Sequence, residues 1–592
     1  MNHWQGTILH IDLEEPTYWL EQPPAEVFYT WIGGKGLAGY YLRPVVTRSW
    51  DDAEMPILIM AGPLVGTAAP TSGRICMMSR SPLTGAIGDC SVGGSFGTEL
   101  RKAGLEGIVI TGRSPDLVGI EINDQSITFT DARRFVKMEI SPLYTQLKAR
   151  GAVAAIGPAA ENGVLFATVM IDGHFAAGRT GLGRVFATKN LKYLTVKGSG
   201  RIPVHNRENL LKARTDIFRQ VAASPVLMGE HGITNYGTGA LYDLMHSRRM
   251  MPTANFRSTR FEAAPALNAS IFKQHYAPKR AGCKGCHIRC KKVAPNGSHL
   301  PEFETMSHFS ALLENDDLET ITQANKICNE TGIDTISAGG TLACYAEING
   351  LKLQPAQILN LLHAIGRGEG VGAELGQGSY RYATAKGRPE LSFSVKKLEL
   401  PAYDPRGAYG MALAYVTSTR GGCHLRAYPI SHEILRKPVA TDRFSFEGKA
   451  RIIKIAEDLN AVVDSLTACK FVFFASTLEE YAKAFTAVTG IDMTAQDLLK
   501  VGERIYYHER VMNTLNGFSS KDDDLPARFF QDNGTSGSGI EIKPLDRQAF
   551  LQVRANYYQI RGLDPKGKPT PEKVRELGLP DFPEEQLIFI KV

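Results

Sequence analysis

The character of the sequence changes near residue 200, and this change limits the folds that the chain can adopt. Before it, the chain is rich in glycine and contains short apolar runs with many β-branched residues, such as TILHIDL, PILIMAGP and GIVITGR. Such runs are typical of β-strands. After a cluster of turn residues at 196–200, apolar residues recur with the longer period of amphipathic helices, as in ENLLKARTDIFRQVAA and TAQDLLKVGERIYYHERVM. The pattern predicts an α+β protein with a β-rich N-terminal domain and a mostly helical remainder.

Two local expectations follow from the same reasoning. The runs VGIEI and ITFTD flank residues 123–126, so we expect a β-hairpin there. The segment from Ser519 to Gly539 is polar and rich in Gly and Ser, and it follows the last long helical period. We expect this segment to form a surface loop.

Composition excludes several classes of protein. Hydrophobic residues make up 43% of the 592 residues and charged residues 22%, which are ordinary globular values. The net charge of +6 is too weak for a dedicated nucleic-acid-binding protein. The uncharged stretch 55–73 is interrupted by prolines and glycines, so we expect no insertion into a membrane. The first residues lack the features of an export signal, and we therefore expect a cytoplasmic location.

Three glycine-rich turns lie in the predicted β-rich domain, at 33–36, 93–97 and 178–183, and each precedes a predicted helix. Glycine lets backbone N–H groups approach an anion closely, and a helix N-terminus adds positive potential. These turns could therefore cradle phosphate groups, with Arg74 and Arg179 as further ligands. None of them matches a P-loop or a dinucleotide-binding fingerprint. Ordinary tight-turn geometry remains the alternative for each turn.

The strongest local signal is the motif C-x2-C-x3-C formed by Cys283, Cys286 and Cys290. Nine cysteines in a long chain without a secretory signal do not form a disulfide framework, so metal binding is the leading interpretation. A zinc ion fits the triplet, with His287 as a further ligand. A [4Fe–4S] cluster also fits, and it normally needs four thiolates. Cys469 is the candidate for the fourth, and we favour the cluster.

Basic residues surround the cysteine triplet, namely Lys284, Arg289, Lys291 and Lys292. They could offset the charge of a cluster or bind an acidic electron carrier. A solvated loop without a binding role is the alternative.

Together these motifs resemble the aldehyde:ferredoxin oxidoreductase family. The resemblance extends over most of the chain, and its other carriers are GGKGLAGYYL, TSGRICMMSRSPLTG, GGSFGTELRKAGLEGIVITG, AGRTGLGRVFATKNLK, PEFET, YDPRGAYGMALAYVTSTRGGCH and DSLTAC. It implies tungsten or molybdenum on two pyranopterins (a bis-pyranopterin, or molybdopterin, cofactor), one [4Fe–4S] cluster, and a magnesium ion bridging the pterin phosphates. It also implies a β-rich pterin-binding domain over 1–205, a helical domain with the cysteine triplet over 206–415, and a helical domain with the distal cysteine over 416–592.

The resemblance also assigns binding roles. The family motif D-x-x-G-L-[CD] corresponds to 329–334 and 464–469, and both copies depart from it, because Asn329 replaces an acid and Thr467 replaces a glycine. Asp334 and Asp464 can still accept hydrogen bonds from pterin N–H groups. The cofactor contacts implied are Arg74, Gly93, Gly94, Ser95, Arg179, Thr180, Gly181, Asn329, Asp334, Asp464 and Thr467. The cluster ligands implied are Cys283, Cys286, Cys290 and Cys469.

Two residues match positions where the family places an acid or base near the metal, namely Glu304 in PEFET and His424 in RGGCHLR. Conversion of an aldehyde and water to an acid releases two electrons and needs a base. Glu304 suits that role if burial raises its pKa from about 4 towards 6–7, and His424 could polarise the carbonyl or shuttle protons. Glu302 is the nearest rival. Cys423, beside His424, is expected to be structural.

We therefore predict an enzyme that oxidises an aldehyde to a carboxylic acid and passes electrons through the cluster to ferredoxin or a ferredoxin-like protein. One alternative is a reductive enzyme on the same scaffold, acting on an aryl-CoA or a carboxylic acid. A less favoured alternative is a zinc-stabilised binding protein without redox activity.

If the protein forms a homodimer, we expect an interface of packed helices and hydrogen bonds without an interfacial metal. Some relatives hold a bridging metal with E-x-x-H, where this chain has Gln323 and Lys326 at the same spacing. A neutral amide and a protonated amine are poor metal ligands.

Overall fold

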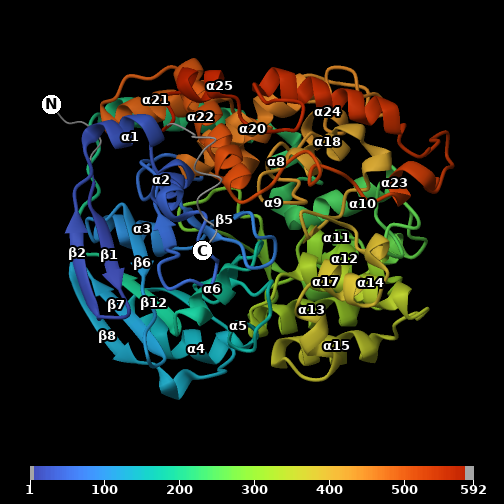
Figure 1. Cartoon of the computed structure of the whole chain (residues 1–592), viewed down its shortest axis with the longest axis horizontal. Helices are drawn as coiled ribbons and strands as arrows, with labels where there is room; N and C mark the ends of the chain where they lie inside the picture. The colour runs from blue at the N-terminus through green and yellow to red at the C-terminus, as the bar shows by residue number, and fades with distance from the viewer. Residues whose placement is uncertain (1–5, 581–592) are drawn as a thin grey trace.

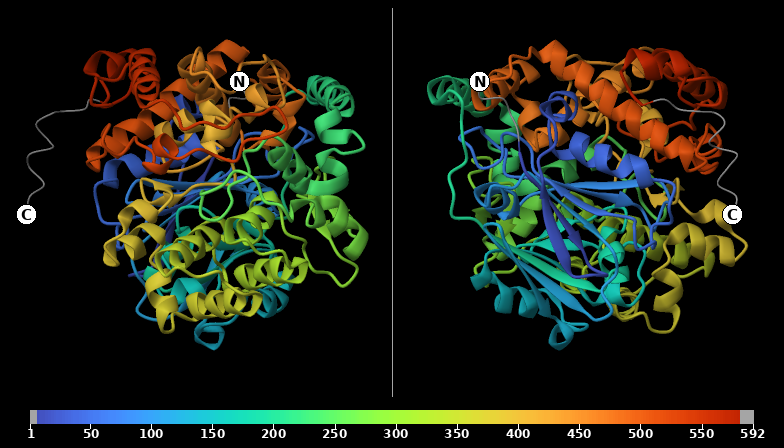
Figure 2. Two further views of the ribbon diagram at one scale, coloured as in Figure 1. Left: turned by 90° about the vertical axis from the view of Figure 1, so that its right-hand side faces the viewer. Right: turned by 60° about the vertical axis from the view of Figure 1, so that its left-hand side comes forward.

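The computed structural model describes residues 6–580, and the first residues of the segment considered for an export signal lie outside this range. Two six-stranded sheets fill the first third of the chain, and helices make up most of the remainder. Figures 1 and 2 show the sheets on one side of the molecule, with helices beside and above them. The predicted α+β architecture is confirmed.

The first sheet has the strand order β2-β1-β6-β3-β4-β5. Its strands are β1 (Ile8–Asp12), β2 (Thr17–Glu21), β3 (Ile57–Met60), β4 (Ile75–Arg80), β5 (Ile87–Val92) and β6 (Gly107–Thr111). Every residue of β3 is buried, which agrees with its wholly apolar sequence ILIM. β5 lies at the edge of the sheet and leads into the second glycine-rich turn and α3 (Phe96–Lys102).

The second sheet has the order β11-β10-β9-β12-β7-β8. Its strands are β7 (Val118–Asn123), β8 (Ser126–Asp131), β9 (Ala152–Ile156), β10 (Val169–Ile171), β11 (Phe175–Ala177) and β12 (Leu191–Lys197). β7 and β8 pair antiparallel from Asn123 opposite Ser126, so the predicted hairpin is confirmed. β11 contacts β5, and the two sheets therefore adjoin where the second glycine-rich turn begins.

The long helical periods form helices as predicted. The clearest cases are α7 (Arg207–Ala222), α13 (Leu318–Thr331), α15 (Pro355–Arg367), α20 (Lys449–Ser465) and α22 (Ala495–Leu515). α20 packs against α22 and α24 (Arg547–Arg561), and also against α2 (Gly34–Leu42). This last contact brings the C-terminal helices over the first sheet (Figure 1).

The prediction of a surface loop over Ser519–Gly539 is wrong at its centre. Asp523 is completely buried and forms ion pairs with Lys396, at 2.7 Å, and with Arg510. Phe529, on the short helix α23 (Arg528–Gln531), is also buried. A charged residue can enter the interior when an opposite charge meets it there, and the local sequence does not show those partners.

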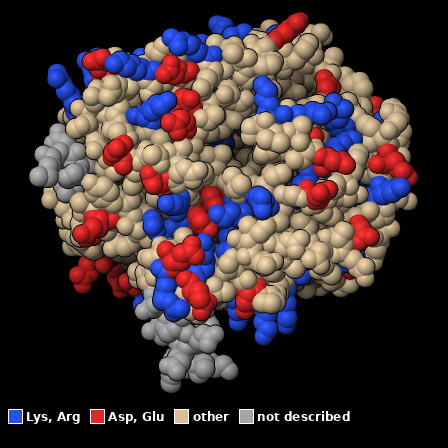
Figure 3. Space-filling model, turned by 90° about the horizontal axis from the view of Figure 1, so that it is seen from above, with Lys and Arg blue, Asp and Glu red and all other residues tan. Residues whose placement is uncertain are grey.

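The described surface carries both signs of charge. Seen from above, Lys and Arg are interspersed with Asp and Glu, and this face is hollowed near its centre (Figure 3). Within residues 6–580, no helix has both the length and the apolarity that crossing a bilayer requires.

Candidate active site and cysteine loop

Glu304 and His424, the two predicted catalytic residues, lie together and are called the acid–base pair below. Glu304 is in the first turn of α12 (Phe303–Phe309). Its Oε1 lies 3.6 Å from Nε2 of His424, and its Oε2 accepts a hydrogen bond from the backbone N–H of Ala402 at 2.8 Å. Glu304 Oε1 and His424 Nδ1 are buried atoms without a hydrogen-bond partner in the described part of the chain. The fold therefore joins two residues that are distant in sequence.

Burial changes the protonation of both members of the pair. It raises the pKa of Glu304 to about 8. Burial also holds the pKa of His424 well below its usual value, and the charge of Arg179 adds to this effect. The His424 ring lies beside Tyr403 and Tyr428, with ring centroids 5.4 Å and 5.9 Å away. At neutral pH, Glu304 is therefore mainly protonated and His424 is a neutral imidazole.

His308 is a neighbour of the pair that the sequence analysis did not select. Its Nδ1 lies 2.7 Å from the carbonyl oxygen of Glu304 and 3.6 Å from the Glu304 carboxylate, and its Nε2 lies 3.3 Å from the carbonyl oxygen of Leu400. Burial lowers the pKa of His308 to about 4. The i, i+4 spacing of Glu304 and His308 on one helix is a signal that could have found it. Glu302 instead pairs with Lys291 of the cysteine loop, at 3.2 Å.

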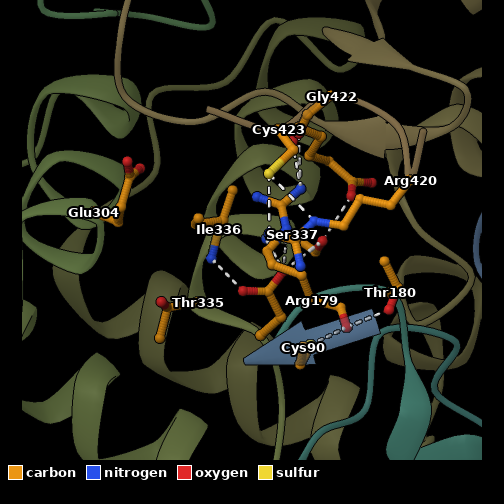
Figure 4. A network of polar contacts seen from close by, with 12 residues as sticks. Cys90, Arg179, Thr180, Glu304, Thr335, Ile336, Ser337, Arg420, Gly422 and Cys423 are labelled. Atoms are coloured by element: carbon orange, nitrogen blue, oxygen red, sulfur yellow. Dashed lines mark hydrogen bonds and ion pairs between the residues drawn. The ribbon is translucent and has the colours of Figure 1, made fainter. Parts of the chain in front are cut away.

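The first pterin-like motif lies at the junction of two helices. Asp334 caps α14 (Thr335–Ile348) by accepting hydrogen bonds from the N–H groups of Ile336 and Ser337. Arg179 faces Asp334 with Nε at 3.3 Å and donates from Nη2 to the carbonyl oxygen of Glu399 at 2.6 Å. Figure 4 shows Arg179 and Ser337 close together, with Glu304 to one side. Asn329, by contrast, is half-buried within α13.

The second motif lies at the end of α20. Asp464 Oδ2 pairs with Lys470, at 2.7 Å, while its buried Oδ1 has no hydrogen-bond partner in residues 6–580. Thr467 adopts the left-handed conformation (φ 54°), as Gly332 does in the first motif (φ 74°). The Thr467 hydroxyl accepts a hydrogen bond from the N–H of Gly62 at 3.1 Å. Both motifs thus end a helix with a left-handed residue, although only one of them uses glycine.

The second glycine-rich turn has internal partners. The N–H and the hydroxyl of Ser95 both donate to one carboxylate oxygen of Asp172, at 2.6 and 2.8 Å. A Cβ on Gly94 would lie 2.9 Å from the same oxygen. A Cβ on Gly93 would lie 2.3 Å from Sγ of Cys283, so this turn approaches the cysteine loop closely. A carboxylate thus occupies the N–H donor of Ser95, and the phosphate contact stays a prediction.

The other two glycine-rich turns also pack tightly. Gly181 is left-handed (φ 79°), and a Cβ there would lie 1.9 Å from the carbonyl oxygen of Leu165. Thr180 uses its own carbonyl oxygen to accept a hydrogen bond from the Ser81 hydroxyl, at 2.7 Å. A Cβ on Gly34 would lie 2.5 Å from the carbonyl oxygen of Asp464. Close packing is sufficient to explain these glycines.

Buried ion pairs connect the first glycine-rich turn with the second motif. Lys35 pairs with Glu509, at 2.6 Å, and faces Asp89 of β5 at 3.7 Å. Asp89 pairs with Arg426, which lies 3.6 Å from Asp464. The sequence analysis did not select Lys35, Asp89 or Glu509, because nothing local shows that these charges are buried.

The cysteine triplet lies between two three-residue strands, β13 (Lys279–Ala281) and β14 (Lys291–Val293). All four predicted ligand cysteines are half-buried and free of disulfides. Burial would lower the pKa of Arg74, but the nearby charges of Cys469, Cys283, Asp464 and Cys290 raise it instead. Cys469 therefore lies with the triplet near Arg74.

A single compact metal-binding group is absent from residues 6–580, where no three His, Cys, Asp or Glu side chains are arranged to hold one ion. A [4Fe–4S] cluster does not require such a group, because each of its four thiolates binds a different iron. The arrangement of the cysteines is compatible with a [4Fe–4S] cluster, and the cluster stays a prediction.

Cys423, beside His424, accepts hydrogen bonds from a cluster of donors. Its Sγ accepts hydrogen bonds from Nε and Nη2 of Arg420, at 3.2 and 2.9 Å, and from the N–H of Leu425 at 3.3 Å. Burial alone would raise the pKa of the Cys423 thiol, but Arg420, Arg426 and Arg179 outweigh this effect and lower it. Figure 4 shows the sulfur facing the guanidinium groups. The hydrogen bonds to this sulfur thus anchor the turn that carries His424.

Unpartnered buried atoms test whether the site fits a bound group. Among the described residues, such atoms include Glu304 Oε1 and His424 Nδ1 of the acid–base pair, and Asp464 Oδ1 and Arg426 Nε at the second motif. Leaving a buried polar atom without a partner is costly, so these atoms indicate a polar ligand. Carboxylates accept hydrogen bonds from pterin N–H groups, and guanidinium groups bind phosphates. The residues present therefore fit a pterin cofactor.

The residues considered for a subunit interface lie on α13. Gln323 donates a hydrogen bond to Glu319 at 2.6 Å, and Lys326 is exposed. A homodimer without an interfacial metal stays a prediction.

Comparisons with known proteins extend over nearly the whole chain. Residues 8–198 match the N-terminal domain of aldehyde ferredoxin oxidoreductase, and residues 212–579 match domains 2 and 3 of the same enzyme. The tungsten-containing aldehyde ferredoxin oxidoreductases of Pyrococcus furiosus and Thermococcus kodakarensis are each 35% identical, over 98% of this chain and 99% of their own.

A solved structure, the active site complex BamBC of benzoyl coenzyme A reductase with 1,5-dienoyl-CoA, has a TM-score of 0.83 and 21% identity, over 97% of both chains. At this identity it shows the shared fold alone. The family matches and the two relatives show that the chain belongs to the aldehyde ferredoxin oxidoreductase family.

Proposed function

We propose that this protein is a tungsten- or molybdenum-pterin oxidoreductase that oxidises an aldehyde to a carboxylic acid. Its electrons leave through a [4Fe–4S] cluster to ferredoxin or a ferredoxin-like protein. The observation that carries the proposal is the buried acid–base pair, in which Glu304 Oε1 and His424 Nδ1 have no hydrogen-bond partner among residues 6–580. The 35% identity to tungsten-containing relatives supports the same conclusion.

The residues that would hold the pterin group surround the pair. Asp334 and Asp464 would accept hydrogen bonds from the pterins, and Arg179 and Arg426 would bind their phosphates. The four cysteines would hold the cluster. When bound, the metal–pterin group would supply a two-electron acceptor and the cluster a one-electron exit.

The acid–base pair would manage the protons of the reaction. An aldehyde and one water yield a carboxylic acid, two protons and two electrons. In its ionised form, Glu304 would accept a proton from water or from the hydrated aldehyde, because its raised pKa makes it a stronger base than an exposed carboxylate. His424, 3.6 Å away, would relay that proton or donate a hydrogen bond to the substrate oxygen. His308 would hold the backbone and carboxylate of Glu304 in place.

Three further parts of the proposal concern organisation. We keep the division into domains at 1–205, 206–415 and 416–592. We also keep the cytoplasmic location, the magnesium ion between pterin phosphates, and a dimer, if one forms, without an interfacial metal.

The experiment that tests the function is metal analysis of anaerobically purified protein, followed by turnover with aldehydes. We expect roughly four iron atoms and one tungsten or molybdenum atom per chain, and reduction of ferredoxin that depends on an aldehyde. Protein that is loaded with zinc and free of iron would contradict the proposal. Protein with the full metal complement that reduces an acid or a thioester, and oxidises no aldehyde, would favour the reductive alternative.

A further inference from the structure

We propose that exposed basic residues around the cysteine loop form the docking surface for an acidic iron–sulfur electron carrier. This inference rests on the proposed function, because it assumes that electrons leave through this loop. The residues are called the basic rim, and they are Arg214, Lys279, Arg280, Lys284 and Arg289. All of them are exposed.

The structure divides the basic residues near the triplet into two groups. Lys291 is half-buried and pairs with Glu302, and Lys292 is buried and donates to the carbonyl oxygens of Arg289 and Cys290, at 3.1 and 3.4 Å. These two lysines serve the interior of the loop. Lys284 and Arg289 are exposed at the surface.

Most of the rim carries charge that no neighbouring acid neutralises. Among residues 6–580, only Lys284 of the rim forms an ion pair, with Glu99 at 3.0 Å. An unpaired cation presents its full charge to an approaching protein, so the rim would attract an acidic partner.

Contacts within the rim keep its members around the loop. Arg289 donates from Nη2 to the carbonyl oxygen of Arg280, at 2.7 Å. The Arg214 guanidinium lies 4.9 Å from the centroid of the Phe218 ring, which meets the His287 ring edge-on at 4.5 Å. His287 lies between the second and third cysteines of the triplet. The rim therefore borders the cysteines from both the loop and α7.

The cysteines themselves lie close to solvent. Cys283, Cys286 and Cys290 are half-buried. A carrier that docks on the rim would lie against the loop that carries three of the four predicted cluster ligands. Charge complementarity would bring it there and orient it.

The test compares two triple variants with equal changes in charge. The rim variant is Arg214→Glu, Lys279→Glu and Arg280→Glu, which spares the cysteines and their immediate neighbours. The control is Arg134→Glu, Lys148→Glu and Lys352→Glu, whose residues are also exposed and lack ion pairs in the described chain.

The probe is an acidic two-[4Fe–4S] ferredoxin. Its Kd is measured by calorimetry at low salt, and its kcat/KM is measured in turnover. Benzyl viologen, a dication, serves as the second electron acceptor.

We expect the rim variant to weaken ferredoxin binding and to lower kcat/KM for ferredoxin by about tenfold or more, and the control to change both by less than about twofold. Viologen reduction should stay near the wild-type rate in both variants. Unchanged ferredoxin affinity in a rim variant that retains its visible cluster absorption would overturn the proposal.

If the rim variant fails to assemble its cluster, a second measurement on the wild-type protein tests the proposal instead. In the wild-type protein, kcat/KM for ferredoxin should fall steeply as salt rises, whereas the viologen rate should not. A ferredoxin rate that is insensitive to salt would overturn the proposal. Wild-type protein that binds ferredoxin in this way and oxidises no aldehyde with viologen would contradict the proposed function and leave the docking surface supported.

Discussion

The cysteine loop is short, half-buried and rich in cations, whereas Glu304, on α12, and His424, in the segment after α18 (Tyr409–Thr417), each have a buried side-chain atom without a hydrogen-bond partner among the described residues. The two regions meet at the start of α12. Glu302 pairs with Lys291 of the loop, and Glu304, two residues further on, faces His424. Proton chemistry at neutral pH needs a buried carboxyl with a raised pKa, while electron exit needs nearness to a partner. One helix turn thus contributes to both regions.

The largest effect is expected from a variant that damages the predicted cluster site and leaves the acid–base pair intact. Cys469→Ser should damage the cluster, because the fourth thiolate comes from this distant residue, and ferredoxin-linked turnover should be lost. Iron content and the visible spectrum of the anaerobic protein measure this. A full, normal cluster signal in the variant would show that Cys469 is not a ligand.

The reverse experiment disables the acid–base pair and keeps the cluster. Glu304→Gln and His424→Asn should each lower turnover by about 10²–10⁴-fold, because each removes a placed proton-transfer group. Metal content and the cluster spectrum should stay unchanged. Glu302→Gln is the matched control, since it makes the same change two residues away on the side of the loop, and it should retain most viologen turnover. Near wild-type rates for Glu304→Gln would remove Glu304 from the mechanism.

A third comparison uses two buried cysteines near the acid–base pair. Cys423→Ala should leave Arg420 without its counter-charge and cost about 3–5 kcal/mol of stability. Cys90→Ala should cost less, because burial raises the pKa of Cys90 to about 11 and this residue is a neutral thiol. Thermal midpoints measured under identical conditions test the difference. Equal midpoints for the two variants would show that Cys423 carries no charge that matters to folding.

The smallest effect concerns pH. If Glu304 is the base, only its carboxylate is active, so kcat/KM for the aldehyde should rise with pH up to about 8 and then level off. Below that value the rate should fall by about tenfold per pH unit. Glu304→Gln should remove this dependence from its residual activity. A wild-type profile that is flat between pH 6 and 9 would contradict the assignment.

Features that depend on residues close together in the sequence were predictable from the sequence. The switch from short β-branched runs to long helical periods indicated the α+β fold, and the hairpin at 123–126 followed from its flanking runs. The cysteine spacing and the family-like motifs identified the residues that the fold brings together as the acid–base pair. Hydrophobic period and motif spacing are local properties, so they can be read before the chain folds.

Other features depended on tertiary contacts. Asp172 reaches the N–H of Ser95 from another strand region, Asp523 enters the interior beside Lys396, and the pKa of Cys423 is lowered because the charges of Arg420 and Arg426 lie near it. In each case, the charge and the burial of a side chain are set by residues that are distant in sequence.

By itself, the sequence determined which residue types are available at this site, the order of its strands and helices along the chain, and its family. Only the tertiary structure decided which of these residues are buried, which are paired, and which lysines and arginines near the cysteines face solvent. The physical reason is that the pKa of a group and the cost of an unpaired charge depend on its three-dimensional surroundings.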